Sequence, residues 1–222
     1  DKPEDYSEEA MTKIAKKYSK EADSINQSRT TNLTDNTVIM VLSETFSDPT
    51  RVPGVSFAED PMPNIRQIKS ETTSGLMLSP GYGGGTANIE YQALTGLSMA
   101  NYSDTLSIAY QQLVPGQKWD QSLNQLWNEK NGEDSSVAFH AYNRGMYFRD
   151  INYKKFGFSK FYATDGTPKL TDLHPIDSAW YSSDESFYSQ VLKQVQSSDS
   201  NKFYQVVTIQ NHMPYEEDLY TD

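Results

Sequence analysis

Four polar residues that can take part in chemistry each follow a short segment that is a candidate strand. They are Glu44, Thr86, His140 and His212. In open α/β sheets, ligands bind where the carboxyl ends of the strands meet. If the segments before these residues are parallel strands, the four side chains lie along one edge of the sheet. This convergence predicts a site there that combines a carboxylate, a hydroxyl and imidazoles.

The elements that would position them can be predicted from apolar patterning. Short apolar runs are typical of buried strands, and runs with a period of 3.6 residues predict helices. The expected strands are 38–42, 137–139 and 203–209, with a weaker candidate at 74–78. Three helices are expected, one directly after Thr86 and the others at 122–130 and 184–196. Strands that alternate with helices predict an α/β fold with a largely parallel sheet flanked by helices.

The first 36 residues have a different pattern. Residues 6–22 predict an amphipathic helix that Ser7 can cap, and a polar linker follows it. Such a helix serves for packing or as a tether. We therefore divide the chain into 1–36, the helix and linker, and 37–222, the domain that carries the chemistry.

Composition excludes several classes of function. The formal net charge of −11 over 222 residues argues against a nucleic-acid partner, because a phosphate backbone requires a basic face. The chain contains no cysteine, so it has no disulfide, no thiolate zinc site and no cysteine nucleophile. No segment reaches the length of a membrane span.

The glycine-rich loop from Gly81 to Thr86 leads into a predicted helix. It lacks the Gly-Lys-Ser/Thr ending of a P-loop and the spacing of a dinucleotide fingerprint. A helix N-terminus presents free N–H groups to an anion. Thr86 is either an ordinary N-cap or, beside a divalent cation, a nucleophile, and the two roles are compatible.

Each of the other candidates also has a structural interpretation. Glu44 can be a solvated loop acid or a cap, which we weigh equally with ligation of magnesium or manganese. His140 can be an edge histidine that bonds the backbone, and His212 can start a turn before Pro214. His174 we interpret as structural or exposed.

The segment from Asn143 to Asp150 adds an arginine and a tyrosine. Arg149 can offer a bidentate fork to a phosphate, and Tyr147 can contact a small polyol. Taken alone, a surface loop with an Arg–Asp pair is the more probable interpretation. The aromatic run from Tyr153 to Tyr162 is better explained as core.

Four stretches in this order resemble the extracellular catalytic domain of lipoteichoic acid synthase and related glycerol-phosphate transferases, in the alkaline phosphatase/sulfatase superfamily. The resemblance covers roughly residue 36 to the end. The stretches are VIMVLSETF with Glu44, GGGTANIEYQALTGL with Thr86, FHAYNRGMYFRDINYKKFGF with His140, Tyr147 and Arg149, and TIQNHMPY with His212.

The resemblance implies a metal-dependent phosphoglycerol transferase. Mn²⁺ or Mg²⁺ is held by Glu44 and Thr86, together with an aspartate and a histidine nearer the C-terminus. Thr86 attacks the headgroup of phosphatidylglycerol, and glycerol phosphate passes to a polyglycerol-phosphate or glycolipid acceptor. The substrate-binding residues it implies are His140, Tyr147, Arg149 and His212. It also implies an extracellular location at the membrane of a Gram-positive bacterium, with membrane spans upstream.

Two departures from the family pattern stand out. Tyr147 replaces the usual tryptophan, which bears on headgroup or acceptor preference. The late Asp-His pair is absent, so we expect this chain to be a C-terminally truncated form with an incomplete sheet. Such a fragment should hold the metal weakly and be inactive alone.

Two alternatives remain open beside the transferase. One is a phosphodiesterase of the same superfamily, which would release glycerol phosphate to water. A sulfatase is disfavoured, because the chain lacks the Cys/Ser-x-P-x-R motif that formylglycine formation requires. The other alternative is a non-catalytic module that binds teichoic acid or glycerol phosphate.

Overall fold

The computed structural model describes residues 4–81 and 85–221. Two of the three consecutive glycines before Thr86, Gly83 and Gly84, lie outside the described residues. The chain divides into two compact units, residues 1–36 and residues 37–222, and each is described by itself.

The first unit contains one long helix, α1 (Glu8–Asn26). Ser7 caps it as predicted, because its hydroxyl accepts a hydrogen bond of 3.1 Å from the backbone N–H of Ala10. The helix runs four residues beyond the predicted end. Its apolar stripe, which includes Ile14 and Tyr18, is exposed. Within the described residues, no helix is both long and apolar enough to cross a bilayer.

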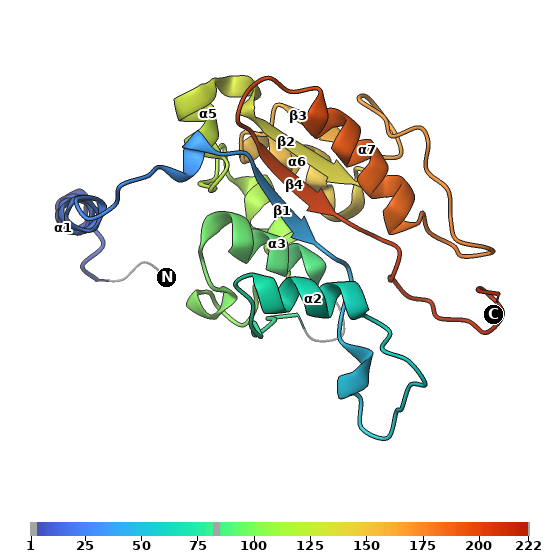
Figure 1. Ribbon diagram of the computed structural model, residues 1–222. Helices are drawn as coiled ribbons and strands as arrows, with labels where there is room; N and C mark the ends of the chain where they lie inside the picture. Colours follow the sequence, from blue (N-terminus) through green and yellow to red (C-terminus); the bar gives the residue numbers. More distant parts are fainter. Residues whose placement is uncertain (1–3, 82–84, 222) are drawn as a thin grey trace. The chain divides into compact units, whose positions relative to one another are not determined.

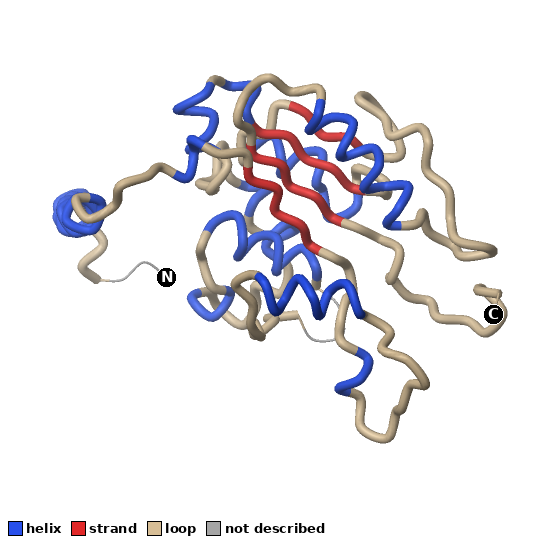
Figure 2. The backbone as a smooth tube through the Cα atoms, viewed as in Figure 1, coloured by secondary structure: helices blue, strands red, loops and turns tan. Residues whose placement is uncertain are grey.

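The second unit is built on a parallel sheet of four strands, in the order β1-β4-β2-β3. The strands are β1 (Val38–Leu42), β2 (Ser136–His140), β3 (Lys160–Tyr162) and β4 (Phe203–Val207). Figure 2 shows them side by side. Both β2 and β4 are buried along their whole length, as expected for central strands of a sheet covered on both faces.

Helices cover both faces of this sheet. One face packs against α3 (Thr86–Thr95), α4 (Ala109–Gln112), α5 (Gln125–Asn131) and α6 (Arg149–Lys155). The other face packs against α7 (Asp184–Gln196), which lies across the sheet in Figure 1. Alternate residues of one strand therefore face different cores: Ala138 belongs to the first, and Val137 and Phe139 to the second.

The face under α7 is covered unevenly. Phe187 and Val191 of α7 pack over β2 and β4. On β1, Ile39 and Val41 occupy the same face as Tyr204 and Val206 by register, yet they are 42% and 45% exposed. Among the described residues α7 thus covers the centre of the sheet and leaves β1 half open.

The comparison with the predicted elements gives one clear error. Residues 74–78 form no strand: Leu76, Met77 and Leu78 are 78%, 87% and 95% exposed in an irregular segment. The sequence analysis also missed β3, α6 and α2 (Pro63–Glu71). The aromatic run after Tyr153 is core, as predicted, because Phe156 and Phe158 lie in the cluster between α6 and the sheet.

Candidate active site

Glu44 and Thr86 meet at the carboxyl end of β1. The Thr86 hydroxyl donates to Glu44 and lies 2.8 Å from both carboxylate oxygens. Both residues are only 9% exposed. The backbone N–H of Glu44 donates to the hydroxyl of Thr208, just beyond β4, at 3.0 Å. The segment after β4 therefore holds the backbone of Glu44, the residue whose carboxylate the Thr86 hydroxyl meets.

Thr86 is the first residue of α3 and is not its cap. The cap is Gly85, whose φ of +86° places it in the left-handed region that glycine adopts without strain. Because the Thr86 side chain makes no capping hydrogen bond, the N-cap interpretation is wrong. Its hydroxyl donates to Glu44, next to the positive end of the helix, and makes no hydrogen bond to the backbone of the described residues.

His140 ends β2 and is almost fully buried. Its Nδ1 lies 3.0 Å from the carbonyl oxygen of Val207, which can only accept, so Nδ1 carries the proton. Burial lowers the pKa of His140 well below its usual value, and the charges of Arg149 and His212 act in the same direction. The ring is therefore neutral, with Nε2 as an acceptor. This is the contact expected of an edge histidine, and a role in substrate binding stays a prediction.

His212 lies in the turn after β4. Its backbone N–H donates to the carbonyl of Ile209 at 2.9 Å, and its Nδ1 lies 2.6 Å from the carbonyl oxygen of Met213. Its ring contacts that of Tyr181 edge-on, with 5.5 Å between centroids. The predicted turn before Pro214 is present. The residue is half-buried, and contact of its ring with a headgroup stays a prediction.

Arg149 is buried and pairs with Glu90 of α3. Its Nε lies 3.1 and 3.2 Å from the two carboxylate oxygens, and its Nη2 also donates to Glu90. Tyr153 adds a hydrogen bond of 2.7 Å from its hydroxyl to the same carboxylate. Burial alone would lower the pKa of Arg149, but the charge of Glu90 outweighs it and raises that pKa. The interpretation of Arg149 as part of a surface Arg–Asp pair is therefore wrong, because its partner is the buried Glu90. Phosphate binding by Arg149 stays a prediction.

Tyr147 lies over the same arginine. The Arg149 guanidinium is 5.3 Å from the centroid of the Tyr147 ring, within the range of a cation–π contact. Tyr147 and Phe148 both have φ near +55°, an unfavourable conformation for aromatic residues. Asn152 holds this turn, because its Nδ2 donates to the carbonyl of Tyr147 at 3.0 Å. The turn before α6 is therefore held in place beside the buried Arg149.

Sequence reasoning missed Glu90 and Thr208. Glu90 lies four residues after Thr86 in the same helix, so the two side chains share one helical face. That spacing was the available signal, because a charged residue on the buried face of a helix requires a partner. The partner, Arg149, lies 59 residues away, and local pattern does not reveal it. Thr208 carried no comparable signal.

The oxygen donors of Glu44 and Thr86 fit a hard divalent cation such as Mg²⁺ or Mn²⁺ in type. A carboxylate and a hydroxyl are too few for a full site. Among the described residues, no three His, Asp or Glu side chains are grouped so that they could bind a metal. The chain thus supplies two of the ligands implied by the resemblance.

Comparison with known proteins identifies the family. The sequence profile of the sulfatase family matches residues 36–222. The chain belongs to the sulfatase family. The phosphoglycerol transferase GacH of Streptococcus pyogenes, solved in complex with sn-glycerol-1-phosphate, is 37% identical to this sulfatase-family chain. It superposes with a TM-score of 0.87, over 98% of this chain and 56% of that chain.

Other relatives agree with this assignment. The lipoteichoic acid synthase LtaP of Listeria monocytogenes has the same fold at 20% identity, with a TM-score of 0.63 over 87% of this chain and 47% of that chain. A Rhizobium meliloti protein named for cyclic beta-1,2-glucan modification is 35% identical over 82% of this chain. The lipoteichoic acid synthase-like YvgJ of Bacillus subtilis is 29% identical over 37% of this chain and 13% of its own length.

These matches confirm the predicted fold class and the predicted resemblance. The chain spans 26% of the rhizobial protein and 56% of the GacH chain. Activity, substrates and partners of the whole protein therefore belong to the proposal that follows.

Proposed function

We propose that this chain is the nucleophile-bearing part of a phosphoglycerol transferase, with Thr86 as the attacking group. The observation that carries the proposal is the Thr86 hydroxyl, held 2.8 Å from both oxygens of Glu44 at the first turn of α3. The 37% identity to GacH, a phosphoglycerol transferase, supports the reaction class. In this proposal the hydroxyl is the nucleophile, and the carboxylate is the group that accepts its proton.

The proposed reaction takes two steps. In the first, Thr86 Oγ1 forms a bond to the phosphorus of a phosphatidylglycerol headgroup, the bond to diacylglycerol breaks, and the Thr86 proton leaves along its hydrogen bond to Glu44. Diacylglycerol departs after taking up a proton. In the second, the oxygen of an acceptor hydroxyl forms a bond to the phosphorus, the bond to Thr86 Oγ1 breaks, and the proton of the acceptor hydroxyl passes to Thr86. Phosphoryl transfer of this kind depends mostly on positioning and charge stabilisation.

The two oxygen-bearing side chains would also hold a divalent cation, Mn²⁺ or Mg²⁺. Such an ion supplies a lowered pKa for the bound hydroxyl and neutralises charge on the phosphate. Glu44 is suited to this because no lysine, arginine or histidine among the described residues forms an ion pair with it. The free N–H groups at the start of α3 add a positive partial charge beside Thr86.

The remaining site residues would bind the substrate. His140 is held neutral by burial, so its Nε2 accepts a hydrogen bond from a glycerol hydroxyl. His212 and Tyr147 would contact the headgroup from the rim. Arg149 stabilises negative charge nearby while it stays paired with Glu90. The proposed acceptor is a teichoic-acid-type polymer or a glycolipid, at the outer face of the cell membrane of a Gram-positive bacterium.

Replacing Thr86 by alanine in the full-length parent tests the proposal. We expect loss of headgroup transfer from phosphatidylglycerol by a factor of about 10³ or more, whereas Thr86→Ser keeps part of it, since serine retains a nucleophilic hydroxyl. The matched control is Thr95→Ala at the other end of α3, where the hydroxyl donates to the carbonyl of Tyr91 and accepts from the backbone N–H of Leu97. Full activity of Thr86→Ala overturns the nucleophile role.

The products separate transfer from hydrolysis. With labelled phosphatidylglycerol, a transferase moves the label to the acceptor, whereas a phosphodiesterase of this family releases it as free glycerol phosphate. Mass spectrometry of the quenched enzyme should show a glycerophosphate adduct on the peptide that contains Thr86. Binding without turnover in the full-length protein would instead support the non-catalytic module.

A further inference from the structure

A pocket lies at the edge of the sheet opposite to the edge that carries Glu44 and Thr86. It has a volume of about 340 Å³ and opens between the amino ends of β2, β3 and β4 and the C-terminal end of α7. A strand of five residues spans about 16 Å, so this edge is about that far from the edge that carries Glu44 and Thr86. The pocket is therefore separate from the candidate active site.

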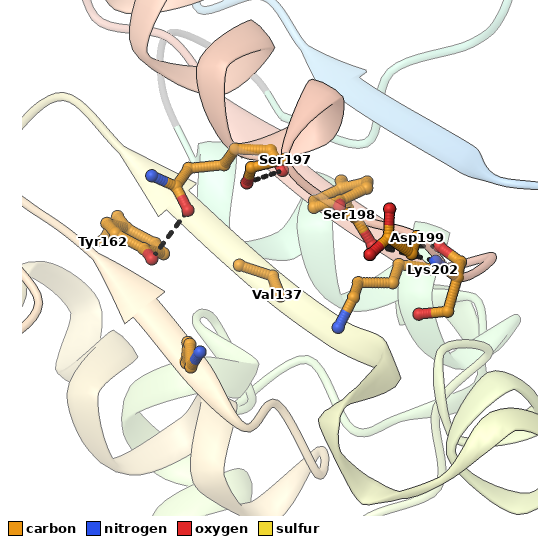
Figure 3. Close-up of a pocket in the computed structure, with 10 residues that line it drawn as sticks. Val137, Tyr162, Ser197, Ser198, Asp199 and Lys202 are labelled. Carbon is orange, nitrogen blue, oxygen red and sulfur yellow. Dashed lines mark hydrogen bonds between the residues drawn. The ribbon is translucent and has the colours of Figure 1, made fainter.

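Strand register places two lysines on one face of this pocket. Lys160 pairs with Val137 of β2, and Val137 pairs with Tyr204 of β4. Lys202 precedes Tyr204 by two residues and so projects from the same face. Figure 3 shows Lys202 and Tyr162 on either side of Val137, under the end of α7. Two ammonium groups from separate segments thus border one hollow.

The pocket offers more donors than acceptors. The Lys160 side chain makes no hydrogen bond or ion pair with the described residues, and Lys202 Nζ uses one donor, on the carbonyl of Asp134 at 2.7 Å. Tyr162 donates to Gln194 Oε1 at 3.0 Å, so the amide nitrogen of Gln194 keeps both of its hydrogens for a ligand. Among the described residues that line the pocket, Asp199 carries the only carboxylate.

The polar groups of this pocket match the groups of a particular class of ligand. Two ammonium groups and an amide suit the oxygens of a phosphate, and one carboxylate suits a hydroxyl carried by the same molecule. A lysine near the C-terminal end of α7 can also stabilise the helix by interacting with the negative end of its dipole, and this structural role would explain the presence of one of the two lysines. This structural role does not explain the pocket itself, whose volume of about 340 Å³ lies within the range of about 300–1,000 Å³ typical of ligand pockets.

We infer that this pocket binds a small phosphate ester that carries free hydroxyl groups. The phosphate lies between Lys160 and Lys202, and a hydroxyl donates to Asp199. This site goes beyond the proposed transfer reaction and does not depend on it, because none of its residues belongs to the catalytic edge. Its exposed lysines, on a chain of net charge −11, make the binding weak and sensitive to salt.

Amide chemical shifts of the chain, titrated at low salt with inorganic phosphate, glycerol phosphate and glycerol, test the inference. We expect glycerol phosphate and phosphate to shift the amides of residues 197–202 saturably, glycerol phosphate the more tightly, and glycerol alone to shift nothing there. Shifts around Thr86 would report the proposed active site separately, so failure of one site is distinguishable from failure of the other.

Charge-matched variants sharpen the test. Lys160→Gln and Lys202→Gln should each weaken phosphate binding by about threefold to fivefold, as expected for exposed charge pairs. Asp199→Asn should tighten inorganic phosphate, because it removes a like charge. Lys20→Gln, on the exposed surface of α1, removes the same charge elsewhere and should change nothing. Absence of shifts in residues 197–202, or equal affinities in all four variants, would overturn the site.

Discussion

Glu44 and Glu90 are two buried carboxylates next to α3, and their surroundings differ. Glu90 belongs to this helix, whereas Glu44 contacts its first residue, Thr86. Glu90 is 1% exposed and accepts hydrogen bonds from the guanidinium of Arg149 and the hydroxyl of Tyr153. Glu44 is 9% exposed, and its carboxylate accepts hydrogen bonds only from hydroxyl groups among the described residues, at 2.8 Å from Thr86 and 3.5 Å from Thr45. One negative charge is compensated inside the fold and the other is not.

This difference separates a structural role from a chemical one. A buried charge without a counter-charge is costly, so a fold retains it where something outside the chain compensates it. Glu90 ties α3 to α6 and needs no ligand. Glu44 carries charge that a cation can neutralise and lies against the hydroxyl proposed as nucleophile. Four predictions test whether the two carboxylates differ in this way.

The same substitution should have effects of very different size on stability at the two positions. Glu90→Gln leaves Arg149 buried without its counter-charge and should lower the free energy of unfolding by about 3–5 kcal/mol. Glu44→Gln removes an uncompensated charge and should change stability by less than about 1 kcal/mol. Urea unfolding of the two variants, followed by circular dichroism, measures both.

A variant that removes both charges serves as the control. Glu90→Gln combined with Arg149→Met replaces the ion pair without leaving a charge unpaired, and it should recover much of the stability lost in Glu90→Gln. Equal destabilisation by Glu44→Gln and Glu90→Gln would remove the distinction between the two carboxylates.

Sequence patterning predicted that Glu44 and Thr86 lie at one edge of the sheet, where they do meet, but it did not reveal the Glu90 cluster. Runs such as Val38–Leu42 and Phe203–Ile209 predict strands from local composition, and the residues that follow them are then placed by topology alone. The pairing of Glu90 with Arg149 joins segments 59 residues apart, and no local pattern encodes it. The error at Leu76–Leu78 has a related cause, because an apolar run becomes a strand only when another strand pairs with it.

The next largest effect should be seen at His140, whose protonation should make the stability of the fold depend on pH. Burial and the charge of Arg149 lower the pKa of this histidine in the folded state. Below the unfolded value of about 6.5 the unfolded chain therefore binds the extra proton, and stability falls by up to about 1.4 kcal/mol per pH unit. Above that pH the contribution is constant.

Urea unfolding between pH 5 and 8 measures this slope, with His140→Gln as the variant that should lack it. His174→Gln is the matched control, since His174 is exposed in a loop and should leave the slope intact. If wild type and His140→Gln lose stability in parallel on acidification, His140 is not the group responsible.

A smaller effect is expected at Thr208, which fixes Glu44 through the backbone. Thr208→Val keeps the volume and removes the oxygen that accepts from the buried N–H of Glu44 at 3.0 Å. The loss should be about 1 kcal/mol of stability. Ser189→Ala, on the exposed side of α7, removes a comparable hydroxyl that bonds only the Glu185 carbonyl, and it should cost less. Equal losses would mean that Glu44 is not specifically held by β4.

The smallest effect concerns the cation itself. Because the described residues offer one carboxylate and one hydroxyl at this edge, millimolar Mn²⁺ should bind weakly and raise the Tm by only about 1–2 °C. Glu44→Gln should abolish that shift, whereas Lys160→Gln at the opposite edge of the sheet should leave it unchanged. A shift that survives Glu44→Gln would place the cation elsewhere, and the uncompensated charge of Glu44 would then need another explanation. A shift that depends on Glu44 ties the uncompensated carboxylate to its counter-charge, in a measurement that needs no turnover.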